Sequence, residues 1–551
     1  GDYIVVIGGR VGQDGIHGAT FSSEEMSAGS PATAVQIGDP ITQKKFSDAI
    51  IREARQLNLY NSITDNGAGG ISCSVAEMAK ECNGCRVFLE KVPLKYPGLA
   101  PWKIWISESQ ERMTLAVPKN KWKVFKALMD KRGVEASVIG EFTSSGKCVV
   151  AYRGKKIMDI ELEFLHNGLP VKQLKTVESK PQLVKSPQSK ISNLTKILEE
   201  MLGRLNIASF EFISRQYDHE VQAGSVLKPL QGRGEVNGDA AVIRPVLSSE
   251  KGVVMSSALA PSYSELDSYK MAAASIDGAV RAAVVAGGDV EKMAILDNFC
   301  WCDSNNPERL WQLKRAVEAC YDYSVAYGTP FISGKDSMFN DFKGFDERGR
   351  SIMISVPPTL LVSAIGVIAN AEKAISLDFK FPGDPVYILG ETYEELGGSE
   401  FLAYLGEEDS DARVPAVDSA RNLRLYKSFA RCAEDGIITS GISLGRGGLG
   451  VALAKSAIGG RLGAEISLKP ISRNTSSDAA TLFSESQGRI LVSIAPANKK
   501  RFEERMKGHF TLLGKVSKSR NVRILGRRGS MAVSLPVASA ERAYKLTFKN
   551  Y

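Results

Sequence analysis

The polar triplet Glu-Ser-Gln occurs twice in this chain, in "WISESQERMTLAV" and in "LFSESQGRILVSI". The first copy is Glu108–Gln110 and the second is Glu485–Gln487. In both copies an arginine follows two residues later and opens an apolar run with the composition of a β-strand. A tripeptide can recur by chance, but agreement of the flanks as well indicates a duplicated module, which limits the folds that the chain can adopt.

The similarity extends on both sides of the triplets. "DYIVVIGGRVGQDGIHG" lies against "DPVYILGETYEELGG", "ITDNGAGGISCSVAEMAK" against "ISLGRGGLGVALAKSAIGG", and "VIGEF" against "LLGKV", in the same order and at nearly the same spacing. Register kept over such a length predicts two copies of one module, at residues 1–170 and 376–551. Their mixture of apolar strands, glycine turns and small-residue helices predicts an α/β fold.

The residues between the two copies differ from them. The connector at 171–204 is rich in lysine, serine and proline; because its stretch 172–196 has no aromatic or arginine residue, it predicts a solvated linker ending in a helix rather than a nucleic-acid contact. Residues 205–375 combine alternating strands such as "AAVIRPVLS" with the helix "SYKMAAASIDGAVRAAVVAGG", which predicts a third module. The duplication implies that a second middle module precedes residue 1.

The composition is that of a soluble globular protein, with 43% apolar and 24% charged residues. No apolar run reaches the roughly eighteen residues of a transmembrane helix, and the first residues lack the pattern of a secretory signal. The net charge of +8 is modest for 551 residues and predicts no nucleic-acid or membrane partner. Eight irregularly spaced cysteines indicate reduced thiols and a cytoplasmic protein. Cys82-x-x-Cys85 has the spacing of half a zinc site, but plain thiols are favoured because no second pair follows.

Several polar residues of the first module are candidates for chemistry. Asp65 precedes the glycine turn "NGAGG" and offers its carboxylate either to Mg²⁺ or to the next helix as an N-cap. The triplet Glu108–Gln110 predicts either ligand contacts or a hydrogen-bond network at the start of a strand. The loop "GQDGIHGATFSS" offers backbone N–H groups and hydroxyls that can bind a phosphate, but glycine-rich turns are more often only turns. Its candidate residues are Gly18, Thr20, Ser22 and Ser23.

In the middle module, "GTPFISGKDSMFND" reads as a strand, a glycine turn and a polar cluster, without the full P-loop pattern. Lys335 and Ser337 carry groups that can meet a phosphate, and Asp336 one that can meet a metal ion. Asp297 ends the strand "MAILDNF", a favoured position for ligand contacts in an α/β layer. No Ser-His-Asp or Cys-His arrangement is recognisable among the four histidines, which gives no support to an enzyme built on histidine.

Together these stretches resemble the phosphoribosylformylglycinamidine synthases. The resemblance is carried by "IGGRVGQDGIHGATFSSEE", "AVQIGDP", "DNGAGG" and "ISESQERM", and it runs over essentially the whole chain. It implies AIR synthetase-like modules, with C-type modules at 1–170 and 376–551 and one N-type module at 205–375. It also implies a ligase of purine biosynthesis, in which ATP phosphorylates the amide oxygen of formylglycinamide ribonucleotide and ammonia then displaces the phosphate to give the amidine.

The resemblance further implies roles for individual residues. Asp65 would hold Mg²⁺, and Asp297 and Gly334 would contact ATP. The substrate contacts would come from Gln36, Glu108, Ser109, Gln110 and Ser337. The family often has Ser-Gly-Asn where this chain has Ser333-Gly334-Lys335, which removes the metal contact expected of that asparagine. No residue of the chain takes the role of catalytic base, because the family's catalytic histidine belongs to the first N-type module.

These implications set the expected partners. They are the missing N-type module, a glutaminase subunit that supplies ammonia, and a small bridging subunit; the chain alone is expected to be inactive. An unpaired N-type module should expose an apolar face, which predicts a homodimer. In the second C-type module Ser443 stands in the place of Asp65 and Arg446 joins the turn, so no Mg²⁺ is expected there. A rival interpretation is a non-catalytic nucleotide-binding scaffold of the same fold.

Overall fold

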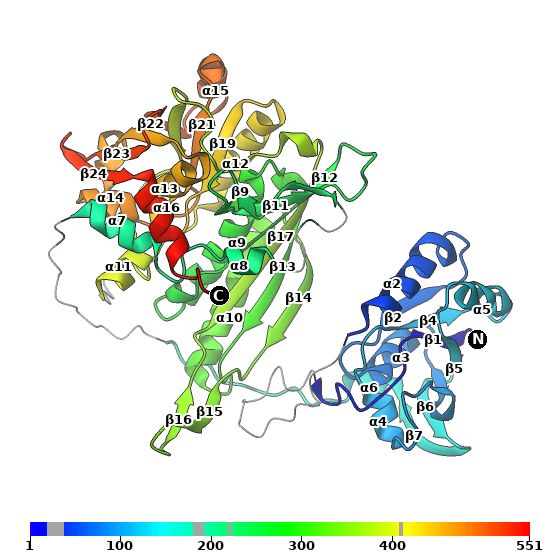
Figure 1. The fold of residues 1–551 in the computed structure, drawn as a ribbon. Helices are drawn as coiled ribbons and strands as arrows, with labels where there is room; N and C mark the ends of the chain where they lie inside the picture. Colours follow the sequence, from blue (N-terminus) through cyan, green and yellow to red (C-terminus); the bar gives the residue numbers. More distant parts are fainter. Residues whose placement is uncertain (19–37, 180–190, 192, 217–219, 221–222, 407–411) are drawn as a thin grey trace. The chain divides into compact units, whose positions relative to one another are not determined.

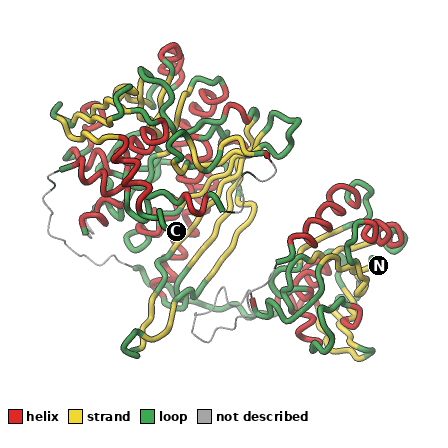
Figure 2. Tube along the Cα trace, in the orientation of Figure 1, coloured by secondary structure: helices red, strands yellow, loops and turns green. Residues whose placement is uncertain are grey.

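The computed structural model describes residues 1–551 apart from 19–37, 180–190, 192, 217–219, 221–222 and 407–411. The chain divides into two compact units, one of residues 1–174 and 339–355, the other of residues 175–338 and 356–551. Both units mix helices and strands (Figure 1; Figure 2). The predicted α/β class is therefore confirmed.

One seven-stranded sheet forms the first unit, in the order β2-β4-β1-β5-β3-β6-β7. Its strands are β1 (Tyr3–Gly8), β2 (Ser62–Asp65), β3 (Cys85–Phe88), β4 (Arg112–Val117), β5 (Ala136–Phe142), β6 (Lys147–Tyr152) and β7 (Lys155–Glu161). Its helices are α2 (Pro40–Ala49), α3 (Ile71–Ala79), α4 (Pro101–Ile106), α5 (Trp122–Lys131) and α6 (Leu162–Asn167). The two faces of the sheet carry separate cores, one beneath α3 and α4 and the other beneath α2 and α5. A hairpin of β15 (Phe342–Phe345) and β16 (Ser351–Ile354) completes the unit.

The second C-type module repeats this sheet in the second unit, with the order β19-β21-β18-β22-β20-β23-β24. Its strands are β18 (Pro385–Leu389), β19 (Ile438–Ser443), β20 (Gly463–Ser467), β21 (Ile490–Ile494), β22 (Phe510–Ser517), β23 (Asn521–Leu525) and β24 (Met531–Pro536). Its helices are α11 (Glu400–Leu405), α12 (Ser419–Glu434), α13 (Gly448–Gly460), α14 (Asp478–Phe483), α15 (Lys499–Arg505) and α16 (Val537–Leu546). Even the irregularities agree, because the pairing of β1 with β5 shifts its register after Ile4 and that of β18 with β22 shifts after Val386. The duplication predicted from the sequence is confirmed.

The N-type module has a six-stranded sheet in the order β14-β13-β17-β12-β11-β8. Its strands are β8 (Ser225–Leu227), β11 (Ala240–Ile243), β12 (Gly252–Ala258), β13 (Met293–Cys300), β14 (Phe331–Ser337) and β17 (Thr359–Ile368), with the short pair β9 (Leu230–Gln231) and β10 (Val236–Asn237). Its helices and that of the connector are α7 (Leu194–Leu202), α8 (Glu211–Ser214), α9 (Ser268–Val285) and α10 (Pro307–Tyr327).

The helix α9 joins the N-type module to the second C-type module. It packs on β12 and β17 and also against α12 and β19, so nearly all its residues are buried. The small side chains of "MAAASIDGAV" permit this close approach on several sides. One hydrophobic core therefore runs through both modules. Within the described residues, no helix is both long and apolar enough to span a membrane.

Candidate functional site

The first Glu-Ser-Gln triplet holds the glycine turn between β2 and α3. Glu108 Oε1 accepts a hydrogen bond from the backbone N–H of Gly69 at 3.1 Å, and Ser109 Oγ accepts one from that of Gly12 at 3.0 Å. Gln110 donates from Nε2 to the carbonyl of Glu108 at 3.1 Å. Glu108 and Ser109 are buried, whereas Gln110 is partly exposed. Two members of the triplet thus hold the backbone, and Gln110 is the member that a ligand can reach.

The buried side chain of Arg112 donates hydrogen bonds to the loop that carries the triplet. Its Nε donates to the carbonyl of Ser109 at 2.7 Å, and its Nη2 donates to that of Ser107 at 2.6 Å. Burial lowers the pKa of Arg112 to about 10. A Cβ on Gly70 would lie 1.9 Å from the Ser107 carbonyl oxygen, so only glycine fits where the loop and the turn meet.

The second triplet repeats this arrangement. Glu485 accepts a hydrogen bond from the backbone N–H of Gly447 at 2.9 Å, and Ser486 accepts one from that of Tyr393 at 3.1 Å. Arg489 donates to two carbonyls of the preceding loop, as its counterpart does in the first module. Each triplet therefore builds a hydrogen-bond network at the start of a strand. This network alone accounts for the repeated sequence, whether or not a ligand binds.

In the second C-type module, an arginine of the N-type module covers the triplet. Arg281 on α9 donates to Ser443 Oγ at 2.8 Å, to the carbonyl of Leu444 at 3.0 Å and to Gln487 Oε1 at 3.2 Å. It also forms a buried ion pair with Asp277. A metal ion beside Ser443 would have to displace this guanidinium, which agrees with the expectation that Mg²⁺ does not bind there.

Asp277 is fully buried and accepts hydrogen bonds from several groups besides its arginine. The donors are Tyr327 Oη at 2.5 Å, Tyr426 Oη at 2.7 Å, Asn422 Nδ2 at 2.9 Å and the backbone N–H of Gly488 at 3.2 Å. Burial raises the pKa of both tyrosines well above its usual value, and the nearby carboxylate adds to the rise. Asp277 and Arg281 were not among the residues predicted from the sequence. The available signal was an Asp and an Arg four residues apart in a helix of otherwise small or apolar residues.

Asp65 lies exposed at the end of β2. Gly70, not Asp65, is the N-cap of α3, and no side chain caps that helix, so the N-cap interpretation is wrong. No group of three or more His, Cys, Asp or Glu side chains in the described residues could enclose a metal ion. Mg²⁺ is commonly held by one or two carboxylates together with phosphates and water. Asp65 fits that mode, as the single protein carboxylate of such a site.

Three buried polar side chains lie behind the turn of Asp65. Ser74 Oγ is 2.7 Å from Asn66 Oδ1 and 2.9 Å from Thr114 Oγ1, and Thr114 donates to Asn66 Oδ1 at 3.0 Å. Asn66 Nδ2 has no hydrogen-bond partner among the described residues. The second module carries apolar residues at the matching positions, which are Leu444, Ala452 and Leu491. Because the same turn forms there without polar groups, the turn itself does not require this polar cluster.

The candidate residues of the N-type module lie on two neighbouring parallel strands. Asp297 pairs in register with Gly334, and a Cβ on that glycine would lie 2.1 Å from Asp297 Oδ1. Burial raises the pKa of the Asp297 carboxyl. Lys335 Nζ lies 3.4 Å from Ser337 Oγ. Asp297 lies within β13 rather than at its end, and Gly334 lies within the edge strand β14 rather than in a turn, so both of these expectations are wrong.

The proposed phosphate loop is described only in part. The backbone N–H of Gly18 donates to the carbonyl of Gly15 at 3.0 Å, which forms a turn in the first part of the loop. The other predicted residues of this region lie outside the described residues: Thr20, Ser22, Ser23 and Gln36.

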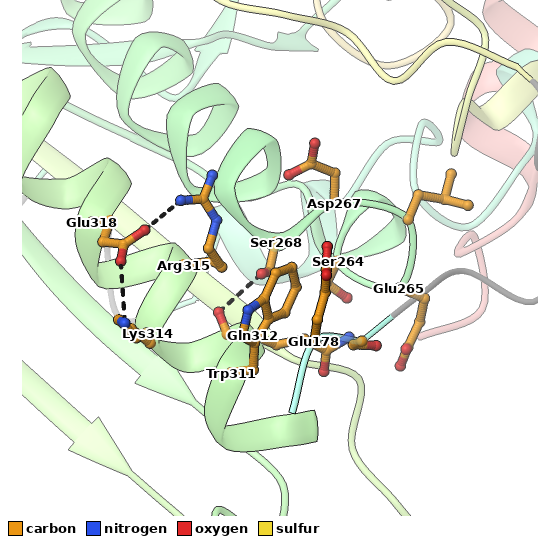
Figure 3. A pocket seen from close by; sticks show the side chains of 12 residues that line it. Glu178, Ser264, Glu265, Asp267, Ser268, Trp311, Gln312, Lys314, Arg315 and Glu318 are labelled. Atoms are coloured by element: carbon orange, nitrogen blue, oxygen red, sulfur yellow. Dashed lines mark hydrogen bonds and ion pairs between the residues drawn. The ribbon is translucent and has the colours of Figure 1, made fainter. Parts of the chain in front are cut away.

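A polar pocket of about 580 Å³ lies between the N-terminal part of α9 and α10 (Figure 3). Glu178 from the connector and Asp267 at the start of α9 line it, together with Lys314, Arg315 and Glu318 of α10. Both basic residues pair with Glu318, so these charges are satisfied within the pocket wall. None of the residues predicted from the sequence lines this pocket.

Known protein families match the chain module by module. The sequence model described as AIR synthase related protein, C-terminal domain, matches residues 1–153 and 382–526, and the model of the N-terminal domain matches residues 237–368. The chain belongs to the AIR synthase-related protein family. Its modules follow the order C-type, N-type, C-type within the sequence.

A curated relative in this family is the phosphoribosylformylglycinamidine synthase subunit PurL of Methanothermobacter marburgensis, which is 33% identical over 502 residues. The alignment covers 90% of this AIR synthase-related chain and 66% of the relative, so the chain spans somewhat less than two thirds of that protein's length. The resemblance to phosphoribosylformylglycinamidine synthase that the motifs predict is confirmed.

Solved structures of Thermotoga maritima PurL share the fold of this AIR synthase-related chain. T. maritima PurL complexed with FGAR has a TM-score of 0.62 and 23% identity, and covers 94% of this chain and 72% of its own. T. maritima PurL complexed with ATP has a TM-score of 0.60 and 21% identity, and covers 94% of this chain and 70% of its own. At such low identity these structures establish the fold alone.

Proposed function

We propose that this chain is part of a phosphoribosylformylglycinamidine synthase, an ATP-dependent C–N ligase of purine biosynthesis. The observation that carries the proposal is the 33% identity with a PurL subunit over 90% of the chain. ATP transfers its γ-phosphoryl group to the amide oxygen of formylglycinamide ribonucleotide. Ammonia then adds to the activated carbon, phosphate leaves with the oxygen, and the amidine remains. T. maritima PurL complexed with FGAR and with ATP supports these two substrates.

In this proposal the residues of the first C-type module have different roles in binding the metal ion, binding the substrate and holding the turn. Asp65 holds Mg²⁺, which neutralises phosphate charge when bound. Gln110 contacts the substrate through its partly exposed amide. Glu108 and Ser109 act mainly by holding the turn, because their side chains are engaged with backbone N–H groups. The remaining assignments are Gln36 and Ser337 to the substrate, Asp297 and Gly334 to ATP, and Gly18, Thr20, Ser22 and Ser23 to a phosphate.

The proposed enzyme needs a second N-type module. Among the described residues, the N-type module at 205–375 packs its helix α9 on the second C-type module, and no further N-type module is found for the first. We assign the catalytic histidine to that second N-type module. A glutaminase subunit and a small bridging subunit complete the assembly, and the Thermotoga maritima PurLQS structure supports a multi-subunit complex. Free cysteines throughout the chain suit the cytoplasm as its location.

Reconstitution tests this proposal. A purified protein of residues 1–551, given formylglycinamide ribonucleotide, ATP, Mg²⁺ and ammonium, should form no amidine. Adding a protein that supplies the second N-type module should start turnover. Amidine formation by the chain alone would contradict the need for a second module. Nucleotide binding without turnover in any mixture would favour the scaffold interpretation instead.

A further inference from the structure

Two buried cysteines face each other across the sheet of the first C-type module. Cys85 is the first residue of β3 and Cys148 the second of β6, and the two are register partners in this parallel strand pair. Their Sγ atoms are 3.3 Å apart, and both side chains are fully buried. The thiol of Cys85 therefore contacts Cys148, which lies far along the chain, and not Cys82, the other cysteine of the Cys82-x-x-Cys85 motif. The proposed function uses neither thiol.

The backbone geometry at this pair suits a disulfide. Register partners on neighbouring strands point their side chains to the same face of the sheet. Neighbouring strands lie about 4.8 Å apart, which falls within the roughly 4.4–6.8 Å between Cα atoms that disulfides span. Rotation of the two side chains is therefore enough to bring the sulfur atoms into bonding contact. We propose that Cys85 and Cys148 form an oxidant-sensitive pair, which a peroxide converts into a disulfide that joins β3 to β6.

The duplicated module shows that packing alone does not require two thiols. The second C-type module has the same parallel strand pair, and its register places Ala464 opposite Val522 at the matching position. Both are buried, as the cysteines are. A small apolar pair is thus sufficient to fill this part of the core. The first module carries sulfur on both strands where its copy carries none.

The pair is buried but lies close to the surface. Asn83, two residues before Cys85, is exposed, and Lys147, the residue before Cys148, is half-buried. Strand ends open more easily than strand centres, which admits a molecule as small as hydrogen peroxide. The S–H of Cys85 donates to the sulfur of Cys148, and this hydrogen bond lowers the pKa of the Cys148 thiol. Cys148 is therefore the sulfur that attacks first.

The reaction proceeds in two balanced steps. The Cys148 thiolate attacks hydrogen peroxide, so that an S–O bond forms, the O–O bond breaks and hydroxide leaves, giving water after protonation. The sulfur of Cys85 then attacks the sulfenic sulfur of Cys148, so that the S–S bond forms and the S–O bond breaks. The leaving hydroxide takes the proton of Cys85 and becomes a second water. Two thiols are oxidised, the peroxide is reduced to two waters, and a dithiol reductant reverses the change.

Peptide mapping tests the pair in the full chain. The folded protein is treated with hydrogen peroxide, unreacted thiols are alkylated in denaturant, and the protein is digested without reduction. Mass spectrometry should find a peptide that joins Cys85 to Cys148 and disappears on reduction, with loss of both thiols in the same molecules. Oxidation should also raise the unfolding temperature of the wild-type chain, because the bond restricts the unfolded state.

In matched variants, each cysteine is replaced by the residue at the same position of the second C-type module. Cys85→Ala and Cys148→Val should each abolish the linked peptide and the rise in unfolding temperature on oxidation. In Cys85→Ala, Cys148 loses the hydrogen bond that lowers its pKa, so it should oxidise more slowly and stop at the sulfenic acid, which a dimedone probe labels. The proposal is wrong if Cys85 and Cys148 in the wild type stay open to alkylation while only the partly exposed Cys73 and Cys82 oxidise. A disulfide between Cys82 and Cys85 would overturn it equally.

Discussion

Asp65 and Ser443 occupy the same position at the end of β2 and β19, but only Asp65 carries a charge. In the reassembled synthase, Asp65→Asn keeps the size of the side chain and removes the anion that holds Mg²⁺. Turnover measured in steady state should fall tenfold or more, which corresponds to about 1.4 kcal/mol of lost transition-state stabilisation. Ser443→Ala is the matched control and should leave turnover within about twofold. Equal losses would mean that the two modules do not differ in this role.

A second prediction concerns the buried carboxylate of Glu485. It accepts hydrogen bonds from the backbone N–H of Glu400 at 3.0 Å and from Tyr263 Oη at 2.7 Å, besides that of Gly447. Burial raises the pKa of Glu485, so the folded protein disfavours its charged form. Glu485→Gln removes the charge and can keep all three contacts. At neutral pH this variant should therefore be at least as stable as the wild type in urea unfolding.

The pH dependence follows from the direction of this pKa shift. A carboxyl with a raised pKa in the folded state binds its proton more tightly there than when unfolded. The wild type should therefore gain stability relative to Glu485→Gln as the pH falls through the folded-state pKa. Glu485→Ala leaves the donors unsatisfied and should cost about 1–3 kcal/mol at neutral pH. A constant difference between the wild type and the glutamine variant across the pH range would contradict the assigned shift.

The packing of α9 on the second C-type module includes one buried ion pair, between Arg281 and Asp277. Arg281→Ala leaves Asp277 without its cation inside the core. The free energy of unfolding should fall by about 3–5 kcal/mol, as for other uncompensated buried charges. Urea unfolding followed by tryptophan fluorescence measures this loss.

A double variant separates the contribution of charge to stability from that of packing at the same interface between α9 and the second C-type module. Asp277→Asn with Arg281→Met removes both charges and keeps most of the volume. It should lose less stability than Arg281→Ala alone, because no charge remains unpaired. If the double variant is the less stable of the two, the hydrogen bonds of Asp277 matter more than its charge.

The elements were easier to predict from the sequence than the contacts between them. The repeat specified two like modules because strands, glycine turns and triplets recur in one order. The pair Asp277 and Arg281 could not be predicted, because an Asp and an Arg four residues apart give the same sequence pattern on a solvated helix face as in a buried interface. The N-cap interpretation of Asp65 failed because Gly69 and Gly70, with φ of 73° and 57°, carry the chain through a turn that starts the helix later. The polar groups behind that turn become visible only when the registers of the two sheets are compared.

For the whole molecule, the N-type module predicts self-association. Its edge strand β14 exposes Ile332 at 62%, and α10 exposes Tyr321 at 70% and Val325 at 64%. We expect a dimer at micromolar concentration, with two N-type modules meeting about a two-fold axis through their β14 edges. Ile332→Glu should shift the chain to a monomer in light scattering, and Val325→Glu should not. A monomeric wild type would refute the dimer, and a response to Val325→Glu alone would move the contact to α10.

The central place of β1 in its sheet has a consequence for the order of folding during synthesis. Tyr3 pairs with Val117 and with Glu141, so the ribosome must make β4 and β5 before β1 has both of its neighbours. At about 5–20 residues per second, this is a wait of roughly 7–30 seconds for an apolar strand. The second copy repeats the problem with β18, which needs β21 and β22. Because the connector and the N-type module are translated between the copies, the first sheet has all its strands before β18 emerges, and the two similar central strands do not compete for the same partners.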